Sequence, residues 1–261
     1  MDAIVLAGGT PKPGELLYPY TNGMPKAMLE ICGKPMIQWV LDALSDSESV
    51  DNVIIVGLPQ ELSVHCSKKM YFVADHAGLT ENLSAGAKKV AEISKQATHA
   101  LFVSSDIPMV TGEMVDWIIN ATGGENKDMF YNVISREVME KRFPNSCRTF
   151  IKFKDIKLCG SDLHVFSLRI LLEGSKGMRK KLADARKSPL KQAALIGFGT
   201  LFLYIIGQLT LKRAERNISK NLKVTGKAVI CPFAEAGMDI DKPRHMEIVT
   251  TGLQKRLENL K

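Results

Sequence analysis

The sequence predicts an α/β fold built on a largely parallel sheet. Through the first half of the chain, short apolar runs typical of buried strands alternate with longer segments of helical periodicity. Such alternation is typical of units in which a helix carries the chain back, so that successive strands run parallel. The length of 261 residues, 45% of them hydrophobic, suffices for a well-buried core. We expect a single domain over residues 1–261.

The elements of the first half are the clearest. Strands are expected at residues 3–7, 53–56, 70–73 and 100–104. Helices are expected at residues 35–44, 82–93 and 111–121, the first with Pro35 in its opening turn and the last with Thr111 as its N-cap. Ligands of parallel sheets bind at the carboxyl ends of the strands, so the loops after residues 7 and 104 are the first candidates for a site.

The second half has a less regular pattern. Strands are expected at residues 129–134, 149–153 and 228–230, and helices at residues 166–187 and 244–260. Residues 193–211 carry no charge and are flanked by basic residues, so one apolar helix is expected there. A helix buried in the core or against a partner is favoured over one that lies on an anionic lipid surface. A membrane span is least favoured, because it would split the sheet in mid-domain.

The formal charge is unevenly distributed. Residues 1–135 carry 9 Lys and Arg against 16 Asp and Glu, whereas residues 136–261 carry 26 against 12. A basic half favours anionic partners such as phosphorylated small molecules, nucleic acid or anionic lipid, or else forms a solvated lysine-rich face. Few aromatic side chains accompany these basic residues and no nucleic-acid-binding module is recognisable, so nucleic acid is not expected as a partner.

The cysteines and histidines are dispersed. The five cysteines never form a CxxC pair, which argues against a zinc site and against a disulfide framework. The first residues also lack the pattern of a secretory signal, so we expect a cytoplasmic protein, with association at the inner face of the membrane as the alternative. The sequence offers no Ser-His-Asp or Cys-His constellation of the kind that would indicate nucleophilic catalysis.

Glycines and a lysine after the first strand indicate a phosphate site. Leu6-Ala7-Gly8-Gly9 places two glycines where backbone N–H groups can approach phosphate oxygens with no Cβ in the way. Lys26 follows on the same side of the sheet, where its ammonium can hold triphosphate oxygens and offset charge at the α-phosphorus. Taken singly, a glycine pair after a strand is more often a structural turn, and the alternative for Lys26 is an ordinary surface lysine.

Carboxylates at two places indicate a metal site. Asp106 follows the strand at 100–104, and Mg²⁺ prefers such oxygen ligands together with phosphate. Asp239 and Asp241 alternate, so in an extended backbone both side chains point the same way and repel each other unless a cation is near. We expect Mg²⁺ there, with Mn²⁺ as a substitute. The alternatives are a turn cap at Asp106 and a charged edge strand for the pair.

The motifs LAGG, PKAMLEICGKPMIQWVLDAL, SSDIP and DIDKP, in this order, resemble the nucleotidyltransferases of the MobA-like type. These include molybdenum-cofactor guanylyltransferases and the cytidylyltransferases of isoprenoid and sugar-acid biosynthesis. The resemblance covers residues 1–121 and 236–258. It implies a single Rossmann-like, GT-A-like nucleotidyltransferase domain with a mixed, mainly parallel sheet and helices on both faces. Residues 1–135 would then bind the NTP, residues 136–235 would serve the acceptor or an oligomer contact, and residues 236–261 would close the metal site.

The resemblance also implies roles for individual residues. The expected NTP contacts are Leu6, Ala7, Gly8, Gly9, Lys12, Lys26 and Asn82. The expected metal ligands are Asp106, Asp239 and Asp241, and Lys26 and Asp106 are the expected catalytic residues. Arg148, Lys152 and Asp162 of the basic half are the expected acceptor contacts. Relatives commonly carry an arginine between LAGG and PK, which this chain lacks, and Lys12 is the candidate replacement.

The implied reaction transfers a nucleoside monophosphate, preferentially from GTP or CTP, to a phosphorylated small molecule or a lipid phosphate, with release of pyrophosphate. A phosphate monoester is already a nucleophile at neutral pH, so no general base is required. A homodimer is compatible with the sequence. Two other functions stay open: a nucleotide-sugar glycosyltransferase or pyrophosphorylase, and a non-catalytic nucleotide-binding regulatory module.

Overall fold

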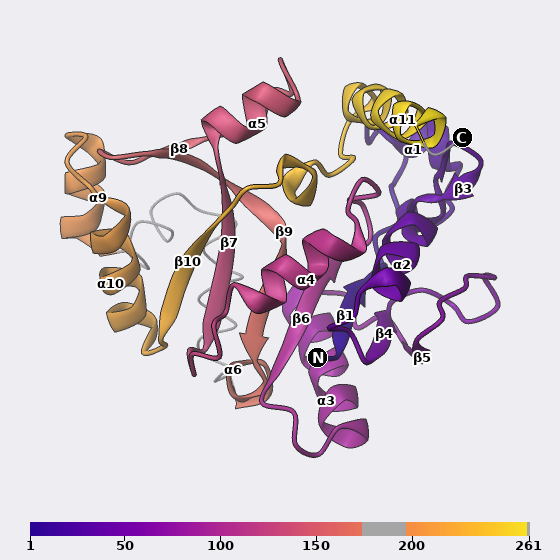
Figure 1. Cartoon of the computed structure of the whole chain (residues 1–261), viewed down its shortest axis with the longest axis horizontal. Coiled ribbons are helices and arrows are strands. Elements are labelled where there is room, and N and C mark those ends of the chain that lie inside the picture. The colour runs from indigo at the N-terminus through magenta and orange to yellow at the C-terminus, as the bar shows by residue number, and fades with distance from the viewer. Residues whose placement is uncertain (174–196, 260–261) are drawn as a thin grey trace.

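A mixed sheet of eight strands runs through the molecule (Figure 1). The computed structural model describes residues 1–173 and 197–259. Seven strands form the path of the sheet, in the spatial order β10 (Gly226–Cys231), β7 (Met129–Ser135), β9 (Lys157–Ser167), β6 (His99–Ser104), β1 (Ala3–Leu6), β4 (Asn52–Val56) and β5 (Lys69–Val73). The short strand β8 (Ile151–Lys152) pairs with β9, and β2 (Glu30–Ile31) and β3 (Lys34–Pro35) form a separate hairpin.

The sheet is parallel except at β9. The pairs β1–β4, β1–β6, β4–β5 and β7–β10 are parallel, whereas β9 is antiparallel to both β6 and β7. The prediction of a mixed, mainly parallel α/β sheet is therefore confirmed. Strands from both halves of the chain take part, so the acidic and the basic half share one sheet.

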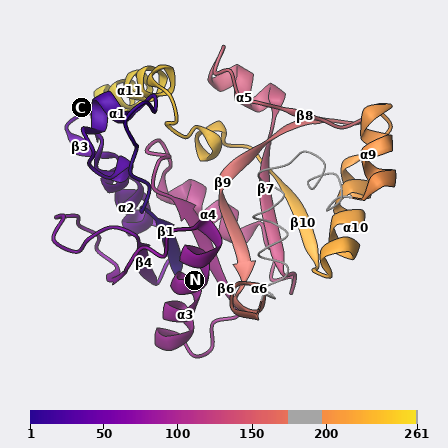
Figure 2. The ribbon, with the colours of Figure 1, turned by 180° about the vertical axis from the view of Figure 1, so that it is seen from behind.

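Helices cover both faces of the sheet (Figures 1 and 2). The helices α2 (Met36–Asp46), α4 (Gly112–Asn120) and α11 (Pro243–Glu258) pack into the same cluster as Ala3 and Val5 of β1. The helices α3 (Leu79–Ile93) and α6 (Leu168–Glu173) pack with Ile4, whose side chain points to the opposite face because strand side chains alternate. Alternate residues of β1 thus pack into two separate apolar cores, one on each face of the sheet.

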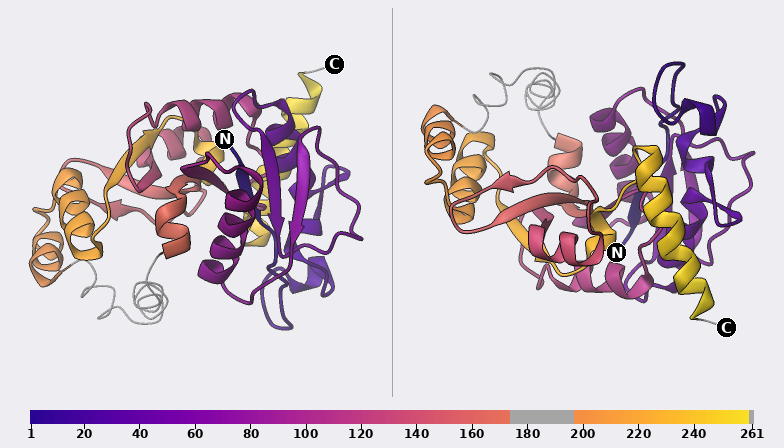
Figure 3. Two further views of the ribbon diagram at one scale, coloured as in Figure 1. Left: turned by 90° about the horizontal axis from the view of Figure 1, so that it is seen from below. Right: turned by 90° about the horizontal axis from the view of Figure 1, so that it is seen from above.

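The remaining helices are shorter or lie at the ends of the sheet. They are α1 (Tyr18–Thr21), α5 (Arg136–Arg142), α9 (Phe198–Ile205) and α10 (Leu211–Leu222), with 3-10 turns η1 (Lys26–Met28) and η2 (Ala234–Gly237). α9 and α10 lie together at the β10 end of the sheet, and the N-terminal half and α11 occupy the other end (Figures 1 and 3). The two ends of the molecule therefore carry different surfaces.

The chain reverses its direction across the sheet at β1, which creates the crevice used by the site. From β1 the chain proceeds to β4 and β5 on one side, and β6 then pairs with β1 on the other. Ligands of open α/β sheets bind at such a switch point, outside the carboxyl ends of the strands. The segments that follow β1 and β6 meet there, because Ser105 N donates to Leu6 O at 3.2 Å and Lys26 Nζ lies 2.6 Å from Asp106 Oδ2.

Most expected elements of the first half agree with the structure within a few residues. Thr111 is the N-cap of α4, and its side chain accepts a hydrogen bond from Met114 N at 3.4 Å, as predicted. The strand expected at 149–153 is reduced to the two residues of β8. The sequence analysis missed β9 altogether, although this strand has 11 residues and lies in the middle of the sheet.

The apolar segment 193–211 is not one helix in its described part, so that prediction is wrong there. α9 ends at Ile205, Gly207 adopts a φ of +68°, and α10 begins at Leu211. A left-handed residue such as Gly207 breaks a helix, because its φ leaves the helical region. Residues 193–196 and most of the helix expected at 166–187 lie outside the described residues. In the part of the chain that the structure describes, no helix has the length and apolar character required to cross a membrane.

Candidate functional site

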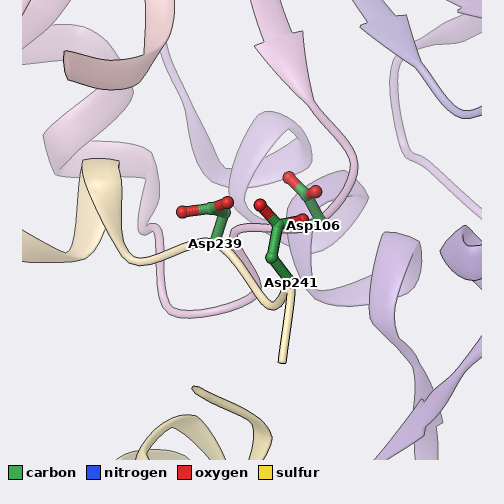
Figure 4. Close-up of side chains that lie close together, drawn as sticks. All are labelled: Asp106, Asp239 and Asp241. Atoms are coloured by element: carbon green, nitrogen blue, oxygen red, sulfur yellow. The ribbon is translucent and has the colours of Figure 1, made fainter. Parts of the chain in front are cut away.

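Three carboxylates from two distant segments meet at the switch point (Figure 4). Asp106 follows β6, and Asp239 and Asp241 lie between η2 and α11. One ligand oxygen of each aspartate lies within 4.8 Å of the others. Ile240 N donates to the carbonyl oxygen of Asp106 at 3.0 Å, which holds the two segments together. The structure thus brings together the three residues that the sequence analysis assigned to a metal.

Two basic side chains neutralise part of this cluster. Lys26 Nζ lies 2.6 Å from Asp106 Oδ2 and 2.6 Å from Asp241 Oδ1, and the guanidinium of Arg148 pairs with Asp239. Burial alone would lower the pKa of Lys26, but the neighbouring Asp106 and Asp241 carboxylates raise it above its usual value. Burial likewise disfavours the Asp241 carboxylate, yet the adjacent Lys26 holds the pKa of Asp241 below its usual value. Lys26 is therefore a cation at neutral pH that links the two acidic segments.

A fourth carboxylate, Asp162 of β9, lies beside the cluster. Its Oδ2 atom is buried and has no hydrogen-bond partner among the described residues, and the nearest guanidinium nitrogen, Nη2 of Arg148, is 4.0 Å away. Burial, followed by the negative charges of Asp106 and Asp241, raises the pKa of Asp162 to about 7. The structure thus groups Asp162 with the acidic cluster, where additional positive charge would stabilise it.

The donor set fits a hard divalent cation. Asp106, Asp239 and Asp241 offer only carboxylate oxygens, which Mg²⁺ and Mn²⁺ prefer, and the buried Oδ2 of Asp162 adds a further oxygen without a hydrogen-bond partner among the described residues. The nearby imidazole of His245 is buried, and its Nδ1 accepts a hydrogen bond from Asp241 N at 3.4 Å. His245 thus supports the backbone of the acidic segment and is not one of the clustered donors.

A cavity of about 440 Å³ opens at the carboxyl ends of β1 and β6. Six of the residues assigned to the NTP or the metal line it: Leu6, Gly8, Gly9, Lys26, Asn82 and Asp106. Gly9 is exposed, and a Cβ built on it would meet no atom within 4 Å, so its backbone faces open space. A glycine at this position lets a phosphate oxygen approach the backbone N–H groups.

Gly8 has a different reason to be glycine. Its neighbour Gly57, at the end of β4, has a φ of +91°, and a Cβ on Gly57 would lie 2.4 Å from Gly8 Cα. A Cβ on Gly8 would lie 3.0 Å from Asp75 Oδ1. The two loops therefore approach so closely that neither position has room for a larger residue without a shift of its neighbours.

Two residues expected at the nucleotide, Ala7 and Lys12, lie outside the described cavity lining. Ala7 is buried, and its N–H donates to Val56 O at 2.8 Å, so its backbone serves the sheet. Lys12 is exposed, and its backbone N–H donates to Glu15 Oε2 at 3.0 Å. Neither is among the described residues that line the cavity. Their assignment to the NTP stays a prediction.

Asn82 lines the cavity, but both ends of its amide are engaged within the protein. Its Oδ1 accepts from His76 N at 2.7 Å, and its Nδ2 donates to Asp75 Oδ1 at 2.7 Å. Asn82 thus holds the loop between β5 and α3 in place, and because these bonds use one of its two N–H donors and one of its two oxygen lone pairs, a contact with a base does not require either bond to break. Asp75, which also lines the cavity, was missed by the sequence analysis, although it follows β5 as Asp106 follows β6.

A second, basic cavity of about 780 Å³ lies beside the acidic cluster. Its lining includes four basic residues, Arg136, Arg148, Lys152 and Lys157. Lys152 of β8 and Lys157 of β9 are opposite each other in the register of these two antiparallel strands. Of the three residues expected at the acceptor, Arg148 and Lys152 are in this lining, whereas Asp162 is not among the described lining residues. Arg148 connects the two regions, because the same side chain pairs with Asp239.

These features define the class of protein. An α/β sheet with a glycine-lined cavity at its switch point, and with a lysine and clustered carboxylates beside it, is typical of proteins that bind nucleotide phosphates. The sequence model of the MobA-like NTP transferase domain matches residues 3–220. The match takes in most of the chain, and the chain belongs to this family of nucleotidyltransferases.

Among curated relatives, similarity is confined to short segments. The bifunctional protein GlmU of Thermoanaerobacter pseudethanolicus is 30% identical over 98 residues, which is 37% of this chain and 21% of that protein. The UTP–glucose-1-phosphate uridylyltransferase AglF of Haloferax volcanii is 38% identical over 64 residues, 24% of this chain and 25% of the relative. The chain thus aligns with a quarter or less of the length of these relatives.

Solved structures match over almost the whole chain. A hypothetical transferase from Thermus thermophilus has a TM-score of 0.80 and 26% identity, with 94% of this chain and 98% of that chain covered. The CMP:2-keto-3-deoxy-manno-octonic acid synthetase complexed with CTP has a TM-score of 0.58 and 14% identity, with 98% of each chain covered. The second similarity concerns the fold alone. The predicted Rossmann-like nucleotidyltransferase fold is confirmed by these neighbours.

Proposed function

We propose that this protein is a Mg²⁺-dependent nucleotidyltransferase. It transfers a nucleoside monophosphate from an NTP, with GTP or CTP preferred, to a phosphorylated small molecule or a lipid phosphate, and pyrophosphate leaves. One observation carries the proposal: the acidic cluster touches both cavities. Lys26 and Asp106 line the glycine-lined cavity, and Arg148, which pairs with Asp239, lines the basic one. A donor and an acceptor bound in the two cavities would meet at this cluster.

The reaction requires positioning and charge neutralisation in place of acid–base chemistry. A phosphate oxygen of the acceptor attacks the α-phosphorus, the bond from the α-phosphorus to the bridging oxygen breaks, and that oxygen leaves with pyrophosphate. Lys26, a cation in this environment, supports the charge that spreads over the phosphate oxygens, and the backbone at Gly8 and Gly9 lies open to the triphosphate. Mg²⁺ held by Asp106, Asp239 and Asp241 would offset charge on the α-phosphate and on the leaving group.

The basic cavity supports an acceptor that carries a phosphate. Its four cationic side chains come from α5, from β8 and β9 and from the loop before β8. Arginine and lysine at the edge of an active site attract and orient phosphate monoesters. The match to a uridylyltransferase named for glucose-1-phosphate adds sugar phosphates, with UTP as a further donor, to the acceptors and donors that deserve a test.

Pyrophosphate release tests the proposal directly. The full chain is assayed with each of the NTPs against a panel of sugar phosphates, small phosphorylated acceptors and lipid phosphates in detergent, with Mg²⁺, Mn²⁺ or EDTA. We expect release with one donor–acceptor pair that depends on the metal. NTP binding without turnover for every pair would contradict the proposal and favour the non-catalytic regulatory module, with the loop at residues 10–24 as the cause.

Asp106→Asn gives the sharpest variant, because it removes the charge and preserves the shape. We expect turnover to fall by about 10²–10³-fold or more, the loss typical when a charge-stabilising group of an active site is removed. Asp42→Asn is the matched control, because Asp42 is not part of the cluster and its Oδ2 forms an ion pair with Lys34 Nζ at 2.7 Å. An Asp106→Asn protein that folds and turns over normally would overturn the metal assignment.

A further inference from the structure

The helix α9 presents large apolar side chains to solvent. Phe202, Tyr204, Ile205 and Ile206 are 62%, 39%, 71% and 47% exposed, and they fall within five consecutive positions. Isolated exposed apolar residues are normal on a protein surface, but a contiguous group marks an interaction site. The opposite side of α9 packs on α10, because Thr200 is buried and its Oγ1 accepts from Asn217 Nδ2 at 2.8 Å. Phe202, Ile205 and Ile206 therefore lie on the outward side, whereas Tyr204, four residues after Thr200, lies on the same side of the helix as Thr200.

The next helix, α10, presents a basic face. Lys212, Arg216 and Lys220 recur every four residues and are exposed, so they form one stripe of positive charge. The apolar side of the helix, with Ala214 buried, faces the sheet. The acidic residue of α10, Glu215, points to β10, where its Oε1 accepts from Ala228 N at 2.6 Å. The outer stripe of α10 thus carries positive charge without an acidic residue of its own.

The two helices form one end of the molecule (Figures 1 and 3). This end lies beyond β10, whereas β4 and β5 lie at the other end of the sheet. Lys154 N donates to Leu209 O at 2.8 Å, so the connection between α9 and α10 is anchored to the segment after β8. A surface bound to α9 and α10 would therefore lie against the basic half of the chain.

We propose that α9 and the outer face of α10 form a docking surface for an anionic lipid membrane. An apolar group beside a basic stripe matches the two layers that a lipid surface offers, with acyl chains beneath anionic headgroups. Phe202, Ile205 and Ile206 enter the interface, and Lys212, Arg216 and Lys220 remain at the level of the headgroups. The protein docks on the surface without spanning the bilayer.

The charges favour lipid over a second copy of this chain. A two-fold contact pairs each patch with its own copy, so a symmetric dimer through α9 and α10 would offer the basic stripe no acidic side chain from the outer faces of these helices. An anionic membrane instead supplies the opposite charge. The docking surface includes none of the residues assigned to catalysis, so its failure in an experiment would leave the proposed nucleotidyl transfer untouched.

Vesicle flotation of the full chain, without any nucleotide, tests the inference. The vesicles are pure phosphatidylcholine or phosphatidylcholine with about one-third phosphatidylglycerol, in which each surface cation contributes on the order of a fivefold gain in partitioning. We expect the chain to float only with the anionic vesicles and to be released by added salt, because salt screens the headgroup charge. A chain that floats with neither vesicle type would overturn the inference.

Two variants separate the components of the surface. Phe202→Ser combined with Ile205→Ser should reduce partitioning by about 100-fold or more, since two large apolar side chains no longer enter the interface. Arg216→Gln combined with Lys220→Gln should reduce it by about 25-fold. These side chains are exposed, so the thermal midpoint of both variants should match the wild type.

Lys88→Gln combined with Lys95→Gln is the matched control, because both lysines are exposed in or just after α3 at the other end of the sheet. It should float as the wild type does. Equal loss in this control would show binding by net charge alone and would overturn the inference. A wild-type dimer that dissociates on Phe202→Ser and Ile205→Ser, with no lipid binding, would also overturn it and assign the surface to a second copy.

Discussion

The substitution Gly9→Ala should separate nucleotide binding from stability. A Cβ at Gly9 meets no atom within 4 Å, and Gly9 lies outside the region of positive φ. The free protein should therefore tolerate alanine, and its free energy of unfolding should be unchanged or rise by about 0.4–1 kcal/mol, because alanine restricts the unfolded chain. The new methyl group, however, projects into the space at the glycine-lined cavity, where phosphate oxygens would approach the backbone.

The loss of affinity follows from the contacts that the methyl group would block. Hydrogen bonds to a charged group contribute about 1.5–3 kcal/mol each, so loss of one such bond to the triphosphate weakens binding by about 10- to 150-fold. Titration calorimetry with the preferred NTP measures this loss, and urea denaturation measures the stability. Wild-type affinity in Gly9→Ala would refute the assignment of this loop to the phosphates.

Gly57→Ala provides the opposite pattern. Its Cβ would lie 2.4 Å from Gly8 Cα, and its φ is +91°, so alanine is strained there whatever the ligand. We expect a loss of stability of at least about 1–3 kcal/mol, the cost of a residue in a disfavoured backbone region. A Gly57→Ala protein as stable as the wild type would show that the two loops do not approach as closely as the structure indicates.

Two further predictions concern an acidic anchor and the acceptor cavity. Asp128 is buried and bonded to Arg169 and Thr225, and these contacts outweigh burial and lower its pKa to about 2. The lowered pKa stabilises the folded state fully above the unfolded pKa, and this stabilisation is lost as pH falls through the folded pKa. Wild type should therefore lose about 2.5 kcal/mol of unfolding free energy relative to Asp128→Asn between about pH 5 and about pH 1. Parallel pH profiles in urea denaturation would contradict this. Lys152→Gln should raise the KM for the acceptor about fivefold with kcat unchanged, because it removes one exposed charge from the basic cavity. Lys154→Gln is the control: Lys154 is exposed but is not among the described lining residues, so the KM should be unchanged.

The residues of the acidic cluster were identifiable in the sequence because each belongs to a local pattern. Asp106 directly follows an apolar run, and Asp239 and Asp241 alternate two residues apart. Both signals depend on neighbours in the chain, so they survive without knowledge of the fold. Asp75 carries the same signal after β5, yet the weaker apolar pattern of that strand concealed it.

The strand β9 shows why other parts could not be predicted. It contains polar residues in the middle of the sheet, including His164, which stacks on Tyr131 with ring centroids 4.1 Å apart and on Phe102 at 5.7 Å. Burial lowers the pKa of His164 to about 3, so the ring is neutral and packs as an aromatic side chain. The sequence records a polar residue there, and only the packing of neighbouring strands makes it a core residue.

Asn82 illustrates the same limit at the level of one side chain. The sequence indicates an amide near the nucleotide, and the residue does line the cavity. Its two bonds to Asp75 and His76 depend on how the loop after β5 folds back on α3. The position of a polar group can thus be foreseen more readily than the partner that satisfies it.

By itself, the sequence determined the α/β class, the order of the elements in the first half, and the residues Lys26, Asp106, Asp239 and Asp241, because periodicity and strand-end motifs are local properties of the chain. The tertiary structure alone decided that β9 enters the sheet antiparallel, that Asp162 joins the acidic cluster, and that Arg148 links this cluster to the basic cavity. It also decided that the apolar segment breaks at Gly207 into two helices with an exposed face. These outcomes depend on contacts between residues far apart in the chain, whose free energies no local pattern encodes.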